Sequence, residues 1–263
     1  MIPMSLPQLL PELLRTQRRR VQAVRRRMGR FWRGVRIACQ DRGASPSAPR
    51  YLFHHIPKCA GTSAVEAFSQ WFQCIEDYPP PWADEDHPER YRDFCASPRD
   101  IRALHPYQML IGHWHVPGSY LHERYPECLA DPRFRLVSFI RDPLEVQISL
   151  YNYERRNSRS HQGASFEDIL LSRPNYIAQR FPCDLSNYRE VIDRYYFIGF
   201  VEDYQRSFNV FASRVAKPSI ILPYLNTSAR KKNGLSSSFQ SEFHELNRLD
   251  FLIYEYCRNR FTL

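Results

Sequence analysis

The chain has 263 residues, of which 43% are hydrophobic and 14% aromatic, enough for one substantial folded domain with its own core. No run of about 18 apolar residues occurs, which excludes a transmembrane helix within this sequence. The net charge of +9 comes from residues 1–48, which hold eleven arginines and two acidic residues, whereas the rest of the chain has 26 residues of each sign.

The N-terminal arm, residues 6–40, is predicted to be a helix rich in Leu, Val and Arg. Its apolar residues recur at helical spacing beside an arginine-rich flank, as in helices that lie on a membrane surface. These residues are Leu9, Leu10, Leu13, Leu14, Val21, Val24, Met28, Phe31, Trp32 and Val35. Three interpretations stay open: an anchor on anionic lipid, a helix packed on the body or a second subunit, and an arm that attracts a polyanion or is disordered. Nucleic acid is not predicted as a partner, because no reader motif accompanies the arginines.

A proline-containing linker over residues 43–49 predicts a boundary, with an arm and linker over 1–48 and one domain over 49–263. The domain opens with a strand pattern over residues 51–56 and, after a short loop, a helical pattern from Ser63. The loop holds small residues and one cation: Lys58, Cys59, Ala60, Gly61, Thr62 and Ser63. A helix N-terminus with free N–H groups beside a Lys predicts a phosphate-binding loop. It differs from the common nucleotide-kinase loop, in which Gly-Lys-Ser/Thr comes last.

A second strand–loop–helix segment covers residues 135–151. Residues 136–140 are predicted to be a buried strand, Asp142 a helix N-cap, and Pro143 part of the first helical turn. Arg141 then lies at the carboxyl end of a strand and Ser149 two turns into the helix. Ligands of open α/β sheets bind at that edge, and the guanidinium fork binds phosphate bidentately.

A histidine follows a third predicted strand. Residues 107–112 are an apolar strand, so His113 lies at its end, where a neutral imidazole can accept a proton near pH 7. His115 would face the same way if the strand continued. His54 and His55 lie in the first strand, one expected to point inward and one outward, and neither is given a catalytic role.

These segments resemble, in the same order, the sulfotransferases that use 3′-phosphoadenosine 5′-phosphosulfate (PAPS). The first loop resembles their 5′-phosphosulfate loop, and Arg141 and Ser149 match the positions that hold the 3′-phosphate. Residues 110–114 resemble the Gly-His segment of the heparan sulfate 2-O-sulfotransferase and related bacterial carbohydrate sulfotransferases. Val146, where the family often has a second Arg, and Cys59 inside the first loop depart from the pattern.

The resemblance implies in-line transfer of a sulfuryl group from PAPS to a hydroxyl of a carbohydrate or glycolipid, releasing PAP without a metal. It implies that His113 is the general base and that Lys58 stabilises the leaving phosphate. A late basic loop, which in the family closes over the cofactor, contains Arg230 and Lys231; a solvated charge cluster is the alternative. Arginines that could flank an acidic sugar, or equally be a solvated surface, are Arg155, Arg156, Arg159 and Arg180.

Strands alternate with helices along the chain, which favours a mostly parallel sheet. We therefore expect an α/β fold with three layers, similar to the P-loop NTPases, in which helices flank a central sheet. Later helices are expected over 166–171, 188–194, 204–215 and 237–260, and later strands over 195–201 and 219–222.

No metal site is predicted, because neither Cys-x-x-Cys nor His-Glu-x-x-His occurs. The seven scattered cysteines and the lack of a secretory signal predict a cytoplasmic enzyme, peripheral at the inner membrane face if the arm binds lipid. Cys59 is interpreted as a loop filler or, alternatively, a reactive thiol. Two functional alternatives stay open: a nucleotide-dependent kinase, and a non-catalytic membrane-associated binding protein of the same fold.

Overall fold

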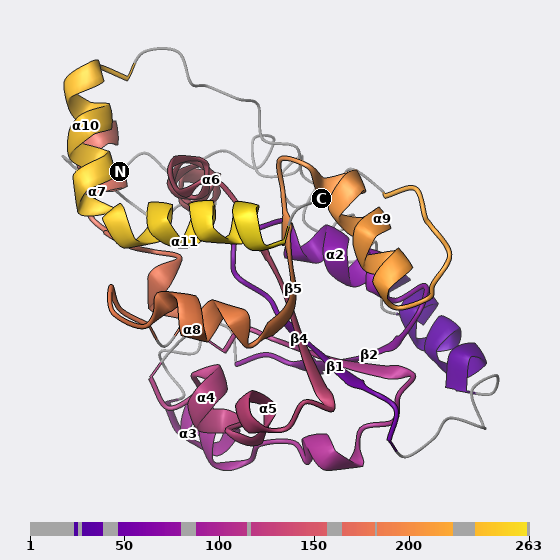
Figure 1. Cartoon of the computed structure of the whole chain (residues 1–263). Helices are drawn as coiled ribbons and strands as arrows, with labels where there is room; N and C mark the ends of the chain where they lie inside the picture. The colour runs from indigo at the N-terminus through magenta and orange to yellow at the C-terminus, as the bar shows by residue number, and fades with distance from the viewer. Residues whose placement is uncertain are drawn as a thin grey trace, which may run out of the picture.

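The computed structural model describes residues 24–25, 28–38, 47–79, 88–114, 117–156, 165–181, 183–222 and 235–261. Its centre is one five-stranded sheet with the order β2-β3-β1-β4-β5, in which every neighbouring pair is parallel (Figure 1). The strands are β1 Arg50–His54, β2 Gln73–Asp77, β3 Gln108–Gly112, β4 Phe134–Ile140 and β5 Tyr195–Phe200. Helices cover both faces, which confirms the predicted three-layer α/β fold.

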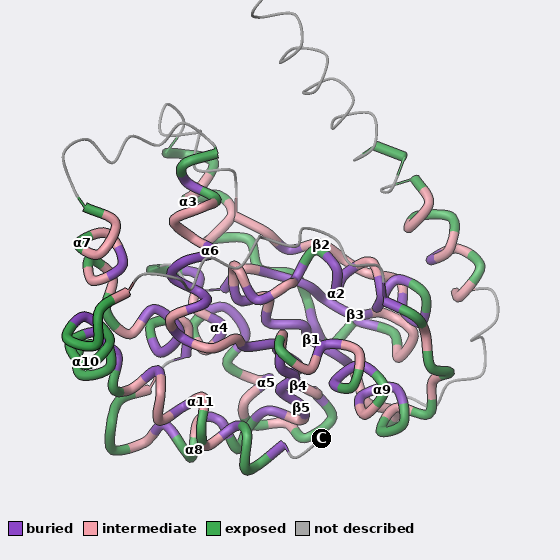
Figure 2. The backbone as a smooth tube through the Cα atoms, turned by 90° about the horizontal axis from the view of Figure 1, so that it is seen from above, coloured by how far each residue is buried: buried purple, intermediate pink, exposed green. Residues whose placement is uncertain are grey.

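The two faces of the sheet pack against different helices because side chains alternate along each strand. Tyr51 and Phe53 belong to an aromatic-rich core shared with α2 (Gly61–Phe68) and α9 (Tyr204–Arg214). Leu52 belongs to the opposite core, shared with α6 (Pro143–Arg156), α8 (Tyr188–Asp193) and α11 (Arg248–Arg260). Figure 2 shows the buried backbone gathered along the central strands and the exposed residues on the outer helices.

The remaining elements lie around these layers. The longer ones are α3 Pro88–Ala96, α7 Phe166–Leu171 and α10 Ser237–Leu246. The short ones are α4 Leu121–Arg124, α5 Glu127–Ala130 and the 3-10 turns η2 Ile101–Ala103 and η3 Ala178–Arg180. The predicted helices over 166–171, 188–194 and 204–215 and the strand over 195–201 are confirmed within one residue at their ends.

Two strand assignments differ from expectation. β2 was not predicted, because its sequence Gln-Cys-Ile-Glu-Asp has little of the apolar character of the inner strands. The strand predicted over residues 219–222 is wrong. The side chain of Gln205 on α9 instead donates to the Ile220 carbonyl at 2.8 Å and accepts from the Leu222 N–H at 3.0 Å. These two hydrogen bonds hold the segment against α9 and not against a strand.

The single helix predicted over residues 237–260 is also wrong, because Asn247 divides it into α10 and α11. Asn247 is fully buried, with a φ of −107° and a ψ of 24°. Its amide nitrogen donates to the Phe243 carbonyl at 2.8 Å, and its amide oxygen accepts from the backbone N–H of Asn175 at 2.9 Å. A polar side chain that satisfies neighbouring backbone groups in this way competes with helix continuation.

Of the predicted N-terminal arm, residues 24–25 and 28–38 are described, and they are helical. The apolar positions before Val24 lie outside the described residues. None of the helices in the described ranges has the length and apolar character needed to cross a bilayer. The domain boundary after residue 48 stays a prediction.

Candidate functional site

Three neighbouring strands carry the predicted site residues at their carboxyl ends. The sheet order places β1 between β3 and β4. β1 leads into the loop with Lys58, β3 into His113 and β4 into Arg141. Parallel strands end at the same edge of a sheet, so these three residues, far apart in sequence, meet at one edge.

The loop after β1 opens α2 without a side-chain cap. Lys58 and Ala60 adopt left-handed backbone conformations, with φ of 67° and 58°, and no side chain caps α2 at Ala60. The N–H groups of Cys59 and Ser63 donate to backbone carbonyls at 3.3 and 3.0 Å. Those of Gly61 and Thr62, like that of Ala60, have no acceptor among the described residues. Uncapped donors at a helix N-terminus are suited to an anion.

Lys58 adds a full positive charge to this loop. Its Nζ lies 4.3 Å from the centre of the Tyr153 ring on α6, and it forms no ion pair within the described ranges. Burial lowers the pKa of Lys58, and the positive charges of Arg156 and Arg141 lower it further. Several cations therefore converge beside the uncapped helix, which favours a multiply charged anion there.

The burial of Cys59 favours its interpretation as a loop filler over that as a reactive thiol. Its side chain is 1% exposed and packs within the core on the α6 and α11 side of the sheet. Burial raises the pKa of the thiol, an effect that outweighs the nearby charge of Arg141. A buried neutral thiol is a poor nucleophile.

The loop after β4 is organised differently. Asp142 caps α6 as predicted, since its Oδ1 accepts the N–H of Glu145 at 3.0 Å. Arg141 lies 3.0 Å from the carboxylate of Glu145, one turn into the helix. Ser149 is buried and lies one turn further along the same helical face. The predicted pair of Arg141 and Ser149 is thus brought onto one face, with a carboxylate between them.

His113 is held by a backbone carbonyl and by two neighbouring rings. Its Nδ1 lies 2.7 Å from the His55 carbonyl oxygen, which can only accept, so Nδ1 carries the proton. The His55 and Tyr78 rings lie 4.1 and 4.7 Å from the His113 ring. Nδ1 of His55 in turn lies 3.1 Å from the Tyr78 hydroxyl. This tautomer puts the basic lone pair of His113 on Nε2.

Electrostatics keep His113 neutral. Burial lowers its pKa to about 4, the nearby charge of Arg180 acts in the same direction, and the hydrogen bond to His55 opposes both. A neutral imidazole at pH 7 is the form that accepts a proton. His54 is fully buried with a pKa lowered to about 3 by burial, and its Nδ1 lies 2.8 Å from the Tyr195 hydroxyl. His54 is therefore the inward-facing member of the pair.

Two glycines leave room for this arrangement. A Cβ on Gly61 would stand 1.7 Å from Nε2 of His55, so that ring lies directly against the start of α2. A Cβ on Gly112 would stand 2.3 Å from the Trp114 ring. The close contacts explain why each loop needs Gly at that position.

A buried polar network lies behind His113. The carboxylate of Asp77 accepts from the indole of Trp114 at 2.8 Å, the guanidinium of Arg124 at 2.9 Å and the hydroxyl of Tyr125 at 2.7 Å. The network fixes Trp114, the residue after His113. Sequence reasoning missed it, as it missed His55, Tyr78 and Tyr153, because each acts through contacts between distant segments.

The remaining predicted residues divide into those that lie outside the described residues and those that the structure describes. His115, Arg159, Arg230 and Lys231 lie outside the described residues. Arg155 and Arg156 are exposed in the last turn of α6. Arg180 stacks 3.5 Å above the Tyr176 ring, and its buried Nε has no hydrogen-bond partner in the described part of the chain.

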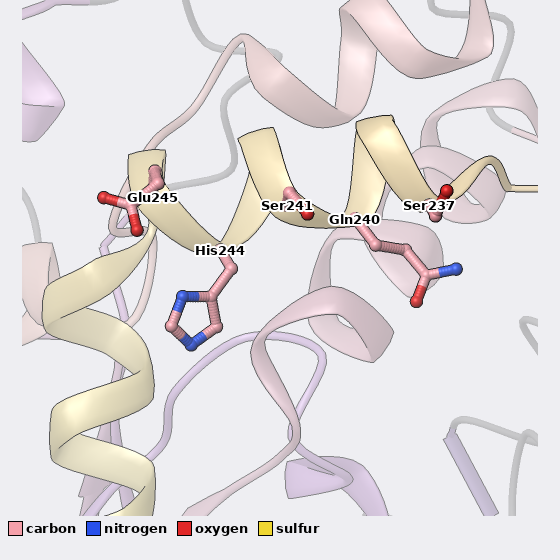
Figure 3. A pocket seen from close by; sticks show the side chains of 5 residues that line it. All are labelled: Ser237, Gln240, Ser241, His244 and Glu245. Atoms are coloured by element: carbon pink, nitrogen blue, oxygen red, sulfur yellow. The ribbon is translucent and has the colours of Figure 1, made fainter.

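A surface hollow elsewhere does not belong to the strand-end site. It is lined by Ser237, Gln240, Ser241, His244 and Glu245, all from α10 (Figure 3). The His244 ring is stacked on Phe251 at 4.5 Å, which occupies one of its faces. Within the described residues, no group of three or more His, Cys, Asp or Glu side chains could hold a metal ion.

No protein-family model matches the chain, and no curated protein matches it. Solved structures do match. A sulfotransferase from Alicyclobacillus acidocaldarius is 15% identical with a TM-score of 0.44, over 78% of this chain and 96% of that one. A mouse sulfotransferase complexed with PAP is 9% identical with a TM-score of 0.41, over 82% and 70%. A retinol dehydratase in complex with androsterone and the inactive cofactor PAP is 15% identical with a TM-score of 0.37, over 79% and 66%.

Identities of 9–15% carry no residue roles from those proteins to this chain. Nor do these matches single out the heparan sulfate 2-O-sulfotransferase group. These matches, with TM-scores of 0.37–0.44, are similarities only, and the resemblance of the two loops to the sulfotransferases stays a prediction.

Proposed function

We propose that the protein transfers a sulfuryl group from PAPS to a hydroxyl acceptor. One observation carries the proposal: an uncapped helix N-terminus with Lys58 lies at the end of β1, next to the strand end that presents the neutral His113. The first feature suits the charged donor, and the second suits an acceptor that must lose a proton. Their proximity is what an in-line transfer between the two requires.

The positive groups of the first loop would act on the leaving phosphate. As the bond from sulfur to the 5′-phosphate oxygen breaks, negative charge grows on that oxygen. Lys58 and the N–H groups of Ala60, Gly61 and Thr62 are fixed donors for this charge. They need no rearrangement, because they lack acceptors among the described residues.

His113 would accept the acceptor's proton. The hydroxyl oxygen forms the new bond to sulfur while its proton moves to Nε2. The hydrogen bond from Nδ1 to the His55 carbonyl becomes stronger once the ring is charged, which supports the transfer. The rings of His55 and Tyr78, both tilted against the imidazole, hold it in one orientation.

Arg141 and Ser149 would hold the 3′-phosphate. Arg141, just before α6, and Ser149 within it lie on one side of this helix, which supports this role, and the phosphate must compete with Glu145 for the guanidinium. Arg230 and Lys231 would close over the cofactor, as the family resemblance implies. No residue in this scheme holds a metal.

A carbohydrate or glycolipid with an acidic group would be the acceptor. Arg155, Arg156 and Arg180 support this, since none of them forms an ion pair with a described residue. Guanidinium groups of this kind bind carboxylates and sulfates.

The test is a calorimetric titration of the full chain with PAP, with ATP–Mg²⁺ and with adenosine 5′-phosphate, followed by a transfer assay with PAPS and a panel of glycan acceptors. We expect PAP to bind more tightly than either competitor and PAPS to be consumed only with an acceptor present. A preference for ATP–Mg²⁺ would support the kinase alternative. PAP binding without turnover on any acceptor would support the binding-protein alternative.

A further inference from the structure

The N-terminal helix, residues 28–38, packs on the body through its arginines. Arg30 donates to Glu76 on β2 at 3.0 Å, and Arg33 donates to Glu66 and Ser69 beside α2 at 2.5 and 2.9 Å. The helix, indigo in Figure 1, therefore lies at the β2 edge of the sheet. Partly buried charged hydrogen bonds of this kind fix which face of the helix is turned outward.

The outward face is apolar. Phe31 and Trp32 are 61% and 64% exposed, and Val24 and Met28 are each 57% exposed. At about 100° per residue these four positions share one side of a helix, opposite Arg30 and Arg33. The amphipathic helix of an ordinary globular protein is turned the other way, with its apolar side on the core. We name this surface the outer face of the N-terminal helix.

Positive charge borders the outer face. Arg25 and Arg36 are exposed and lie beside Trp32 on the helical projection. Residues 13–40 contain ten arginines and no acidic residue. A second copy docked on this face would bring arginines against arginines without a carboxylate from the segment to pair with them, which disfavours self-association.

An anionic lipid surface complements both features. Its headgroups neutralise arginines, and its acyl boundary buries Trp and Phe side chains. We propose that the protein binds the surface of an anionic membrane through Val24, Met28, Phe31 and Trp32, with Arg25 and Arg36 at the headgroups. This surface is separate from the strand-end site, so the inference does not depend on the proposed sulfuryl transfer.

The test is cosedimentation of the full chain with vesicles of equal parts phosphatidylglycerol and phosphatidylcholine, against vesicles of phosphatidylcholine alone. We expect binding to the anionic vesicles only, weakened by added salt. Joint substitution of Phe31→Ser and Trp32→Ser should reduce binding by roughly tenfold or more, because two large apolar side chains that the lipid would bury are lost. Ile221→Ser is the matched control, since Ile221 is a 93% exposed apolar residue elsewhere on the surface.

Fluorescence gives a second readout. The chain has four tryptophans, so the signal of Trp32 is taken as the difference between wild type and Trp32→Phe, in which the other three cancel. We expect that signal to shift to the blue on anionic vesicles. The proposal is overturned if the double variant binds as well as wild type, or if wild type fails to bind.

Sedimentation velocity without lipid tests whether a second copy of the chain binds the outer face instead. A dimer that is lost in the double variant, together with no vesicle binding, would assign the outer face to a second copy and equally overturn the proposal. Circular dichroism and the melting temperature of each variant should match wild type, because the substituted side chains touch solvent.

Discussion

The helices that follow β1 and β4 both begin at the carboxyl edge of the sheet with a cation before them, yet their N-termini differ. α6 is capped by Asp142, and its cation Arg141 is paired with Glu145. α2 has no side-chain cap, and its cation Lys58 rests on an aromatic ring. Among the described residues no carboxylate caps α2 or forms an ion pair with Lys58; the charge of Glu154 on α6 acts on Lys58 without pairing with it.

The difference between the two helix N-termini indicates that they bind an anion in different ways. A capped helix end is already neutralised, so any anion near α6 must be bound by side chains, and it must displace a carboxylate. An uncapped end offers backbone donors and the helix dipole at once. We therefore infer that the reacting end of the donor, where negative charge grows during transfer, belongs at α2 and that Arg141 holds its distant phosphate.

The largest expected effect tests the acceptor side of this arrangement. His113→Ala should lower turnover by about 10²–10⁴-fold, because no general base remains, while PAP affinity stays near that of wild type. The measurement is steady-state sulfuryl transfer combined with calorimetry. His105→Ala is the control, since His105 is exposed and stacks on Tyr107 away from the site. Equal losses in both variants would contradict the role of His113.

The pH dependence of kcat/KM should follow the lowered pKa of His113. The acid limb is expected near pH 4 instead of near the ordinary histidine value of about 6.5. Between about pH 6.5 and 4 the unfolded chain protonates this histidine and the folded chain does not. Folding stability therefore falls as the pH falls through that range. Circular dichroism at each pH separates the two effects. An acid limb centred near 6.5 in a folded enzyme would refute the buried, neutral base.

Removal of the Lys58 charge at α2 should give the next largest loss of turnover. Lys58→Ala should lower turnover by about 10²–10³-fold, in the range found for removing one donor to a developing charge. Lys58→Arg, which keeps the charge, should recover part of that loss, as single-turnover assays with PAPS can show. Little change in turnover for Lys58→Ala would move the reacting end of the donor away from α2.

A smaller effect is expected at α6. Arg141→Ala should weaken PAP binding by roughly tenfold to a hundredfold, the range for a charged hydrogen bond, with less effect on adenosine 5′-phosphate. Glu145→Gln should have the opposite sign and tighten PAP binding a few-fold, because it releases Arg141. Calorimetry on both variants gives the answer. If Glu145 only stabilises the helix, Glu145→Gln should leave PAP affinity unchanged or weaken it, and that result would contradict the prediction.

The smallest effect concerns the cap itself. Asp142→Ala should lower the free energy of unfolding by about 1 kcal/mol through loss of the N-cap. Denaturant unfolding measures this, with Ser165→Ala, which removes the N-cap of the short α7, as the matched control. A variant as stable as wild type would show that the start of α6 does not depend on its cap.

The sequence alone predicts the features that depend on neighbouring residues in the chain. β1, β3, β4 and β5, the Asp142 cap and the strand-end positions of Lys58, His113 and Arg141 follow from apolar runs and from turn residues. β2 was missed because an edge strand need not be apolar, and the break at Asn247 depends on a partner 72 positions away. The surroundings of His113 were missed for the same reason, since Tyr78 reaches it through the fold.

Glu145 shows how far the contacts of the candidate site can be predicted from the sequence. The sequence places it four residues after Arg141, which permits an ion pair but does not require one. Only the fold shows that Arg141 takes this carboxylate, while Lys58 is turned to Tyr153. The contrast between the two helix ends is therefore a property of the folded chain.

The most direct measurement is a grid of calorimetric titrations: PAP, adenosine 5′-phosphate and adenosine 3′-phosphate against wild type, Lys58→Ala and Arg141→Ala. We predict that Lys58→Ala weakens only the ligands with a 5′-phosphate and that Arg141→Ala weakens only those with a 3′-phosphate. Both variants weakening all three ligands equally, or neither weakening any, would contradict the assignment of one phosphate to each helix end.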